Sequence, residues 1–227
     1  MGWADRLALR HLLAAYAARP NSWFARKRQA RYEFFRTVLQ PRSEWRVLDI
    51  GIGTGGALER FNPGLRVVGL NLELPDAGLR TAMPDVRFVV GDGRFLPFTD
   101  GSVDVVFCSS VIEHVGGPED RERLAREIRR VARAYYVQTP NRHFPIEPHY
   151  LFPFFQYLPE RAQRALTRRF ALGHFRRGSY EKITLLAYHD LVRLFPDAVV
   201  FRERCAGLTK SFMVVRQTPP EPVRRGR

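Results

Sequence analysis

The residues of this chain with the clearest chemical potential lie in one short stretch, from Asp49 to Gly56. An acidic side chain ends an apolar run, and the sequence Gly-Ile-Gly-Thr-Gly-Gly follows it. Glycine allows positive φ and lets the backbone approach a ligand without a Cβ in the way. Apolar periodicity resumes at Ala57, which predicts a helix whose first N–H groups suit a polar or anionic ligand. Strand, loop and helix together predict a nucleotide-type binding element.

Strands and helices alternate around this loop. Apolar runs predict strands at 47–50, 65–72, 86–90, 103–108 and 135–138, a helix at 118–133, a helix near 187–195, and two closing strands at 199–205 and 211–215. This alternation is typical of parallel β/α units. We therefore expect an α/β fold: a Rossmann-like, doubly wound, mostly parallel seven-stranded sheet with helices on both faces and an insertion after the fifth strand.

Polar side chains fall at or just beyond the ends of the predicted strands. They are Asp49, Asn71, Asp92, Ser109 and Asn141. Because ligands bind at the carboxyl ends of such strands, these residues are expected to share one site. The glycines also satisfy the dinucleotide pattern G-x-G-x-x-G, but that match is weak by itself. Asp49 before the first glycine would repel a pyrophosphate and favour a cationic amino group, which argues against NAD.

Four motifs in order resemble those of the class I S-adenosylmethionine-dependent methyltransferases. They are VLDIGIGTG at 47–55, VVGLN at 67–71, VGD at 90–92, and FTDGSVDVV at 98–106 with VIEH at 111–114. The resemblance covers roughly residues 45–137, with weaker agreement to residue 215. It is to the small-molecule type, and around Glu113 the chain is similar to the quinone-pathway O-methyltransferases. The resemblance implies S-adenosyl-L-methionine as cofactor.

The resemblance also implies a set of cofactor-binding residues. They are Asp49, Gly51, Gly53, Gly55, Asn71, Leu72, Asp92, Gly93 and Ser109. Asp49 and the glycines would hold the methionine and ribose portions, Asp92 the adenine amino group, and Ser109 would lie near the methionine portion. In the family an acidic residue after the second strand grips the ribose hydroxyls. Here Asn71 stands in that position, so either Asn71 makes a weaker contact or Glu73 takes the role.

Histidines and glutamates that can move protons follow the fourth and fifth predicted strands. They are Glu113, His114, His143, Glu147 and His149. Methyl transfer depends on in-line positioning, and it needs a base only when the acceptor loses a proton. We expect His149 to be that base, with His143 or Glu147 orienting it and His114 as a further catalytic candidate. The plainer interpretation of Glu113-His114, which we favour, is a helix-start element that bonds the backbone.

A metal is not expected. The quinone-pathway enzymes carry a carboxylate three residues before the glutamate, which makes a metal site, and Ser110 occupies that position here. Hard cations need several oxygen ligands. No Cys/His cluster has zinc-site spacing, and Cys108 and Cys205 read as buried thiols.

We expect three parts in the chain. A helical segment at 1–41, including a helix at 3–19, packs on the domain edge or forms a basic lid; the methyltransferase domain spans 42–217; the tail at 218–227 is disordered. The domain includes a substrate-side insertion at 139–178. This insertion combines an aromatic segment at 150–158 with a helix bearing Arg161, Arg164, Arg168 and Arg169 on one face. It would cover an apolar substrate, touch an anionic membrane, or pack on its own core as a lid.

The net charge of +14 fits nucleic acid, an anionic membrane or an acidic substrate. No catalytic Asn-Pro-Pro-Tyr-type motif or Pro-Cys nucleophile supports nucleic acid. We therefore expect methyl transfer to a small or lipid-like acceptor at oxygen. The alternatives are an RNA or other nucleic-acid methyltransferase and a non-catalytic cofactor-binding protein of the same fold. Charged residues interrupt the apolar N-terminus, and no window approaches the ~20 apolar residues of a membrane span. We expect a cytoplasmic protein, with membrane association as the alternative.

Overall fold

The structure, a computed structural model, describes residues 23–52 and 64–217 of the 227-residue chain. Several predicted features lie outside these residues. They are the helix at 3–19, Gly53 and Gly55 with the helix that follows them, and the tail from residue 218.

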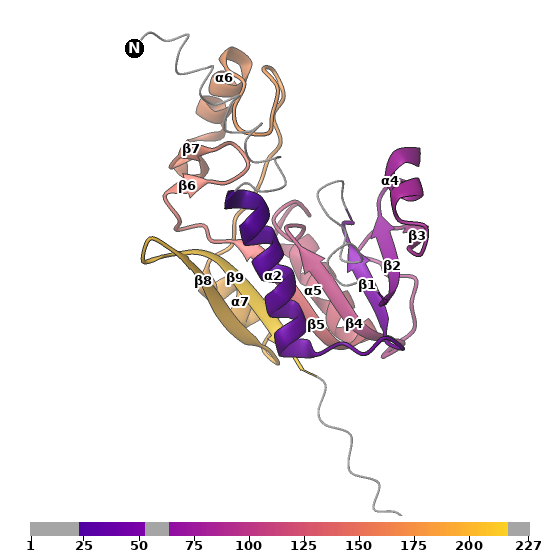
Figure 1. The fold of residues 1–227 in the computed structure, drawn as a ribbon. Helices are drawn as coiled ribbons and strands as arrows, with labels where there is room; N and C mark the ends of the chain where they lie inside the picture. Colours follow the sequence, from indigo (N-terminus) through magenta and orange to yellow (C-terminus); the bar gives the residue numbers. More distant parts are fainter. Residues whose placement is uncertain (1–22, 53–63, 218–227) are drawn as a thin grey trace, which may run out of the picture.

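A seven-stranded sheet forms the centre of the fold, with strand order β3-β2-β1-β4-β5-β9-β8 (Figure 1). Its strands are β1 (Arg46–Ile50), β2 (Arg66–Asn71), β3 (Arg87–Val90), β4 (Val103–Ser109), β5 (Ala132–Pro140), β8 (Val199–Cys205) and β9 (Leu208–Arg216). β1 to β5 pair in parallel, and β9 runs antiparallel to both β5 and β8. The expected Rossmann-like, mostly parallel sheet is confirmed.

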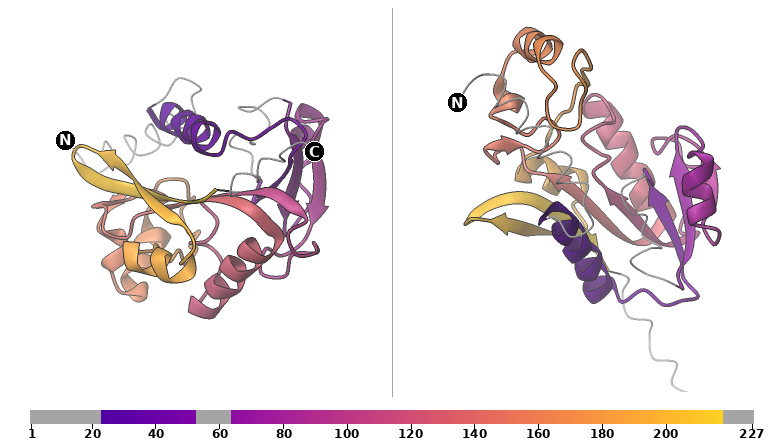
Figure 2. Two further views of the ribbon diagram at one scale, coloured as in Figure 1. Left: turned by 90° about the horizontal axis from the view of Figure 1, so that it is seen from below. Right: turned by 45° about the horizontal axis from the view of Figure 1, so that its top comes forward.

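Helices cover both faces of this sheet (Figure 2). On one face α5 (Pro118–Val131) and α7 (Tyr188–Leu194) bury Leu124, Ile128 and Leu191 against the strands. On the other face α2 (Trp23–Leu39) buries Tyr32, Phe35 and Leu39. The short helix α4 (Ala77–Ala82) connects β2 to β3. A central strand is therefore covered on both sides, which explains why β1 and β4 are almost continuously apolar.

Aromatic rings join α2 to the middle of the sheet. Tyr32 stacks on Phe107 of β4 with ring centroids 5.2 Å apart, and Phe107 stacks on Tyr136 of β5 at 5.1 Å. Phe35 meets both rings edge-on and is completely buried. Burying one such ring contributes about 2–3 kcal/mol. This contact fixes α2 across β4 and β5.

Two predicted boundaries are wrong. The helix predicted to reach Arg133 ends at Val131, because Ala132 already pairs with Val103 and starts β5. The insertion predicted to begin at Thr139 starts inside β5, which extends to Pro140, and it contains β6 (Ile146–Glu147), which pairs with β7 (Phe152–Pro153). Both differences arise from cross-strand pairs, Val103 with Ala132 and Ile146 with Pro153, which the composition of a single strand does not record.

The insertion lies beyond the carboxyl ends of the strands and has a core of its own. After β6 and β7 it contains the 3-10 helix η1 (Phe155–Tyr157) and α6 (Glu160–Arg169). Tyr150, Phe155 and Leu172 form its buried centre, and Tyr150 stacks on Phe155 with centroids 4.1 Å apart. Figure 1 shows this part above the sheet. It is a small separate layer held over the strand ends.

The two cysteines differ in their surroundings. Cys108 is buried in β4, as expected, whereas Cys205 at the end of β8 is half-buried and corrects the prediction, because it adjoins the exposed β8–β9 turn. Within the described ranges, no helix combines the length and apolar character needed to cross a membrane.

Candidate functional site

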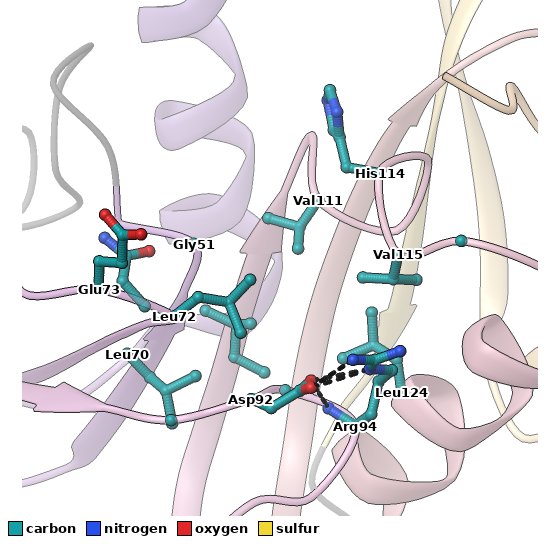
Figure 3. Close-up of a pocket in the computed structure, with 15 residues that line it drawn as sticks. Gly51, Leu70, Leu72, Glu73, Asp92, Arg94, Val111, His114, Val115 and Leu124 are labelled. Atoms are coloured by element: carbon teal, nitrogen blue, oxygen red, sulfur yellow. Dashed lines mark hydrogen bonds and ion pairs between the residues drawn. The ribbon is translucent and has the colours of Figure 1, made fainter. Parts of the chain in front are cut away.

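A cavity of about 560 Å³ opens at the carboxyl ends of β1, β2 and β3 (Figure 3). Doubly wound sheets bind their ligands at this edge, and a small-molecule site of this kind measures roughly 300–1,000 Å³. Residues predicted from the sequence that line the cavity are Gly51, Asn71, Leu72, Asp92, Gly93 and His114. The cavity is therefore suited in position and size to a nucleotide-like cofactor.

Gly51 turns the chain out of β1 with a φ of +78°. A Cβ at this position would collide with the side chain of Val111, which lines the same cavity. The N–H of Gly51 donates to the carbonyl of Leu70 at 2.8 Å, which keeps the turn against β2. Both the backbone conformation and the lack of space therefore require glycine here.

Asn71, the last residue of β2, and Glu73, two residues later, both line the cavity. The amide nitrogen of Asn71 donates to the carbonyl of Ile52 at 2.6 Å, so this side chain braces the start of the glycine loop. Glu73 is exposed, and within the described chain no side chain pairs with its carboxylate. Glu73 therefore offers a whole carboxylate to a ligand, whereas Asn71 has committed one amide N–H to the loop and keeps its Oδ1 as an acceptor.

Asp92 follows β3 and is held by Arg94, as the dashed lines of Figure 3 show. The guanidinium reaches Asp92 at 2.6 Å and also bonds Asp120, at 2.9 Å. The hydrogen bonds from Arg94 hold the pKa of Asp92 below its ordinary value, although burial opposes them. Asp92 is thus fixed as a carboxylate at the cavity wall, and a ligand amino group would share it with Arg94.

Asp49 and Ser109 are not in the described wall of this cavity. Asp49 is buried at the end of β1. The Ser109 hydroxyl donates to Oε1 of Gln138 at 2.8 Å, and the same oxygen accepts from Ser110 and from Arg31. In this structure Ser109 therefore contacts β5 and α2 through Gln138.

A second group of polar side chains gathers beside the cavity, around Glu113. This carboxyl group is buried, and its Oε2 accepts from the Thr139 hydroxyl at 2.9 Å. Its Oε1 has no hydrogen-bond partner among the described residues, and Nε2 of His149 lies 3.9 Å away. Glu113 stands in the loop before α5, and Asp120 accepts from the N–H of Gly117 at the start of that helix.

His149 is oriented by Glu147, one of the two partners expected from the sequence. Nδ1 of His149 lies 2.7 Å from Oε1 of Glu147, while Oε2 of Glu147 accepts from the backbone N–H groups of His149 and Tyr150. The other expected partner, His143, is exposed and lies 3.0 Å from the Tyr157 hydroxyl. Glu147 therefore fixes the ring, and Nε2 of His149 is left to face Glu113.

His114 links this group to the cavity. It lines the cavity wall, and its ring meets that of His149 edge-on with centroids 5.0 Å apart. Its Nδ1 lies 2.6 Å from Oε1 of Glu181. We call Glu113, His114 and His149 the histidine–glutamate cluster.

Gly173 allows the chain after α6 to pack closely against the backbone of the loop that bears His149. It has a φ of +55°, and a Cβ there would collide with the backbone of His149 and Tyr150. The next residue, His174, donates its N–H to the His149 carbonyl at 2.9 Å. The return of the chain after α6 thus locks the backbone that carries His149.

Burial and charge act in opposite directions on the buried members of the cluster. Burial raises the pKa of Glu113, and the nearby His149 and His114 offset only part of this effect. Burial alone would lower the pKa of His149, but Glu147, Glu113 and Glu181 outweigh it and raise that pKa. The two groups are thus electrostatically coupled.

Comparison with known proteins agrees with this geometry. Residues 48–134, which include β1 to β4 and α5, match the family described as a methyltransferase domain. Over residues 48–134, which make up less than half of the chain, the sequence is therefore similar to a methyltransferase domain, in agreement with the class I S-adenosylmethionine-dependent methyltransferases that its motifs resemble. All the described residues that line the cavity at the strand ends fall within the matched range.

Curated relatives cover part of this chain. An uncharacterised methyltransferase of Mycolicibacterium gilvum is 42% identical over 38% of this chain and 34% of its own length. The demethylmenaquinone methyltransferase of Renibacterium salmoninarum is 37% identical over 37% of this chain and 35% of its own length. A thiol S-methyltransferase of Homo sapiens is 28% identical over 58% and 56% of the two chains. The chain thus spans between a third and somewhat over half of the length of these relatives.

Solved structures share the fold over more of the chain. A Pyrococcus horikoshii protein aligns with a TM-score of 0.60 at 19% identity, covering 88% of this chain and 96% of that one. An S-adenosylmethionine-dependent methyltransferase of Methanosarcina mazei gives 0.55 at 18% identity, covering 77% and 92%. At such identities the likeness concerns the fold.

Sequence reasoning missed two side chains of the candidate site. Arg94 follows the Gly-Asp-Gly motif directly, and a basic residue so close to Asp92 is a signal that could have predicted their ion pair. Glu181 contacts His114 from 67 residues away, in an irregular segment. No spacing or periodicity points to that contact.

Proposed function

We propose that this chain is an S-adenosylmethionine-dependent methyltransferase that methylates a small-molecule acceptor at oxygen. The observation that carries the proposal is the place of His114, which lines the cavity and also belongs to the histidine–glutamate cluster. A methyl donor in the cavity would therefore lie next to groups able to handle an acceptor proton.

The proposed cofactor contacts follow from the cavity wall. The backbone at Gly51 meets the methionine and ribose portions, with Leu72 and Gly93 beside the nucleoside. The carboxylate of Asp92 accepts from the adenine amino group while it keeps its bond to Arg94. We assign the ribose hydroxyls to Glu73, because Asn71 is engaged with Ile52 and a carboxylate makes stronger hydrogen bonds than an amide. Asp49 and Ser109 then make no direct contact with the cofactor in this proposal, and they contribute by holding the ends of β1 and β4 in place.

His149 is the proposed base. Its Nε2 accepts the proton of the acceptor hydroxyl as the acceptor oxygen forms a bond to the methyl carbon and the carbon–sulfur bond of the cofactor breaks. The products are the methyl ether, S-adenosylhomocysteine and a protonated His149. The contact between Nδ1 of His149 and Glu147 supports this role, because it fixes the ring and stabilises the imidazolium.

A small acceptor is supported by the names of two relatives, which act on demethylmenaquinone and on thiols. Both are small molecules, and a thiol, like a hydroxyl, carries a proton to be lost. Sulfur is therefore the alternative acceptor atom, and the same assay distinguishes the two.

Within the same proposal, the surface of the insertion suits a lipid-like acceptor or contact with an anionic membrane. Ile146, Phe154 and Tyr157 of the insertion are exposed, and exposed arginines of α6 follow close by in the chain. Apolar side chains beside arginines suit the surface of an anionic bilayer. Flotation with vesicles containing anionic lipid at low salt tests this contact, and wild-type protein that stays in the bottom fraction counts against it.

Cofactor binding and methyl transfer test the main proposal. Calorimetry with S-adenosylhomocysteine should give one site per chain, and methyl-labelled S-adenosylmethionine should label hydroxyl compounds in a panel of phenols, quinols, thiols and RNA. Binding with label in RNA alone would favour the nucleic-acid alternative. Binding without any transfer would favour the non-catalytic one. A chain that binds no S-adenosylhomocysteine is not a methyltransferase of this class.

A further inference from the structure

We propose that the histidine–glutamate cluster is a binding site for one divalent first-row transition metal ion, with Zn²⁺ as the representative ion. One ligand atom from each of Glu113, His114 and His149 lies within 4.8 Å of the other two. Donor atoms about 2.1 Å from a tetrahedral zinc ion lie about 3.4 Å apart. The distance of 3.9 Å between Nε2 of His149 and Oε1 of Glu113 is close to that value. Small side-chain rotations therefore suffice to bring all three donors onto one ion.

The unpaired oxygen of Glu113 is the observation that points to a ligand. Oε1 is buried and has no hydrogen-bond partner in the described part of the chain, whereas Oε2 of the same carboxylate is satisfied by Thr139. Buried polar atoms are nearly always paired, because an unpaired one costs about 1–3 kcal/mol. A metal ion beside Oε1 would supply the missing partner, within reach of one ligand atom from each histidine.

Both histidines are already held in the way that metal-ligating histidines are held. Nδ1 of His149 contacts the carboxylate of Glu147 at 2.7 Å, and Nδ1 of His114 contacts the carboxylate of Glu181 at 2.6 Å. Such outer carboxylates fix the tautomer and leave Nε2 as the donor atom. A base that only accepts a proton needs one oriented histidine, whereas here two histidines beside one buried carboxylate oxygen are each oriented by a carboxylate.

The donor set selects the kind of ion. Two imidazole nitrogens and one carboxylate oxygen suit zinc, iron, cobalt or nickel, whereas magnesium and calcium prefer oxygen alone. The expectation of no metal rested on the missing carboxylate at Ser110 and on the lack of zinc-site spacing along the sequence. His149 comes from the insertion, 35 residues after His114, and changes that chemistry. Three protein ligands leave a coordination position for a water or an acceptor oxygen.

Metal binding itself does not depend on the proposed function, but its use in methyl transfer does. With an ion bound, Nε2 of His149 is a ligand and cannot serve as the base. An acceptor hydroxyl at the open position would instead lose its proton more readily because of the positive charge. The proposed role of His149 as a base then belongs to the metal-free chain.

The test uses the untagged full chain after removal of metal with a chelator. We expect Zn²⁺ to bind at one equivalent by equilibrium dialysis, and Co²⁺ to give the visible absorption of a four- or five-coordinate site. Glu113→Gln and His149→Gln should each weaken binding at least ~100-fold, and Glu181→Gln about 10–100-fold. His189→Gln, at an exposed histidine of α7, should leave it unchanged.

S-adenosylhomocysteine affinity is measured on the same samples. Retained affinity shows that a variant is folded, and it separates failure of the metal site from failure of the cofactor site. The proposal is overturned if the wild-type protein binds neither Zn²⁺ nor Co²⁺. It is also overturned if a folded His149→Gln variant binds these ions as tightly as the wild type does. Should His149→Gln not fold, the same comparison is made with Glu181→Gln, whose side chain lies outside the donor set.

Discussion

Arg31 of α2 and Glu203 of β8 form an ion pair across one face of the sheet, with the guanidinium 2.9 Å from the carboxylate. The same arginine reaches Oε1 of Gln138 in β5, and the same carboxylate accepts from Ser211 in β9. In the sequence Arg31 follows Arg26, Lys27 and Arg28, yet its side chain is largely buried. Its inward position ties the helix to three strands.

Replacing Arg31 tests this network. We expect Arg31→Met to lower the free energy of unfolding by about 2–4 kcal/mol, because it leaves a largely buried Glu203 carboxylate unpaired. Arg26→Met, at an exposed position of the same helix, should change it by less than ~0.5 kcal/mol. Urea unfolding of both variants provides the measurement, and equal effects would contradict the structural role of Arg31.

Glu203 should also make stability depend on pH. Burial alone would raise its pKa, but Arg31, Ser211 and Lys210 outweigh burial and hold it below the ordinary value of 4.5. The stabilisation is therefore fully present above pH 4.5 and is lost as the pH falls through the folded-state pKa. The destabilisation caused by Glu203→Gln should thus be largest near neutral pH and shrink below pH 4.5. A difference that stays constant across this range would be inconsistent with the assignment.

Gly51→Ala should affect the cofactor site more than the fold. The new Cβ would collide with Val111 at a residue whose φ is +78°, so the loop must shift at the cavity wall. We expect at least ~10-fold weaker binding of S-adenosylhomocysteine and a loss of about 1–3 kcal/mol in stability. Gly101→Ala is the matched control, because its φ is +61° but its Cβ meets open space. It should cost stability without changing the affinity.

The proposed ribose contact predicts a difference between Glu73 and a distant carboxylate. Glu73→Gln should weaken S-adenosylhomocysteine binding about 10-fold, as expected for the loss of a charge-assisted hydrogen bond. Glu44→Gln, which lies outside the described cavity wall, should have no effect. Calorimetry decides between them. An unchanged affinity in Glu73→Gln would return the ribose to Asn71.

His149→Gln should separate turnover from cofactor binding. We expect the turnover of a hydroxyl acceptor to fall about 10²–10⁴-fold, whichever of its two proposed roles His149 performs. The affinity for S-adenosylhomocysteine should remain within a factor of two, because His149 does not line the cavity. Initial rates with labelled cofactor give the first quantity and calorimetry the second. Normal turnover would remove His149 from the chemistry.

The sheet could be predicted from sequence because its strands are short apolar runs separated by turn residues. The apolar composition of 47–50 and 103–108 predicts buried strands, and the helices between the strands predict that they run in parallel. The β6–β7 pair could not be predicted in this way, because Ile146 and Glu147 have no local alternation and depend on Phe152 and Pro153.

The candidate site was predictable where its residues follow a strand directly. Asn71 and Asp92 stand immediately after such runs and line the cavity. The same rule failed to place Ser109 in the cavity wall, because its hydroxyl turns toward Gln138. Glu181 could not be inferred, since its contact with His114 depends on how the insertion folds back.

The insertion has a hydrophobic core separate from that of the sheet, and this affects which of its residues can be changed to alter acceptor preference. Tyr150, Phe155 and Leu172 stabilise this layer from within, and Gly173 secures the backbone of His149 at its base. Exposed residues of η1 and α6 can therefore vary without moving His149, whereas Glu160 and Arg164 of α6 contact Lys182 and Tyr180, the neighbours of Glu181. We expect that laboratory evolution confined to the exposed residues within 154–169, with the buried Phe155 and Thr167 kept, alters which compounds are accepted while the methyl-donor pocket is preserved.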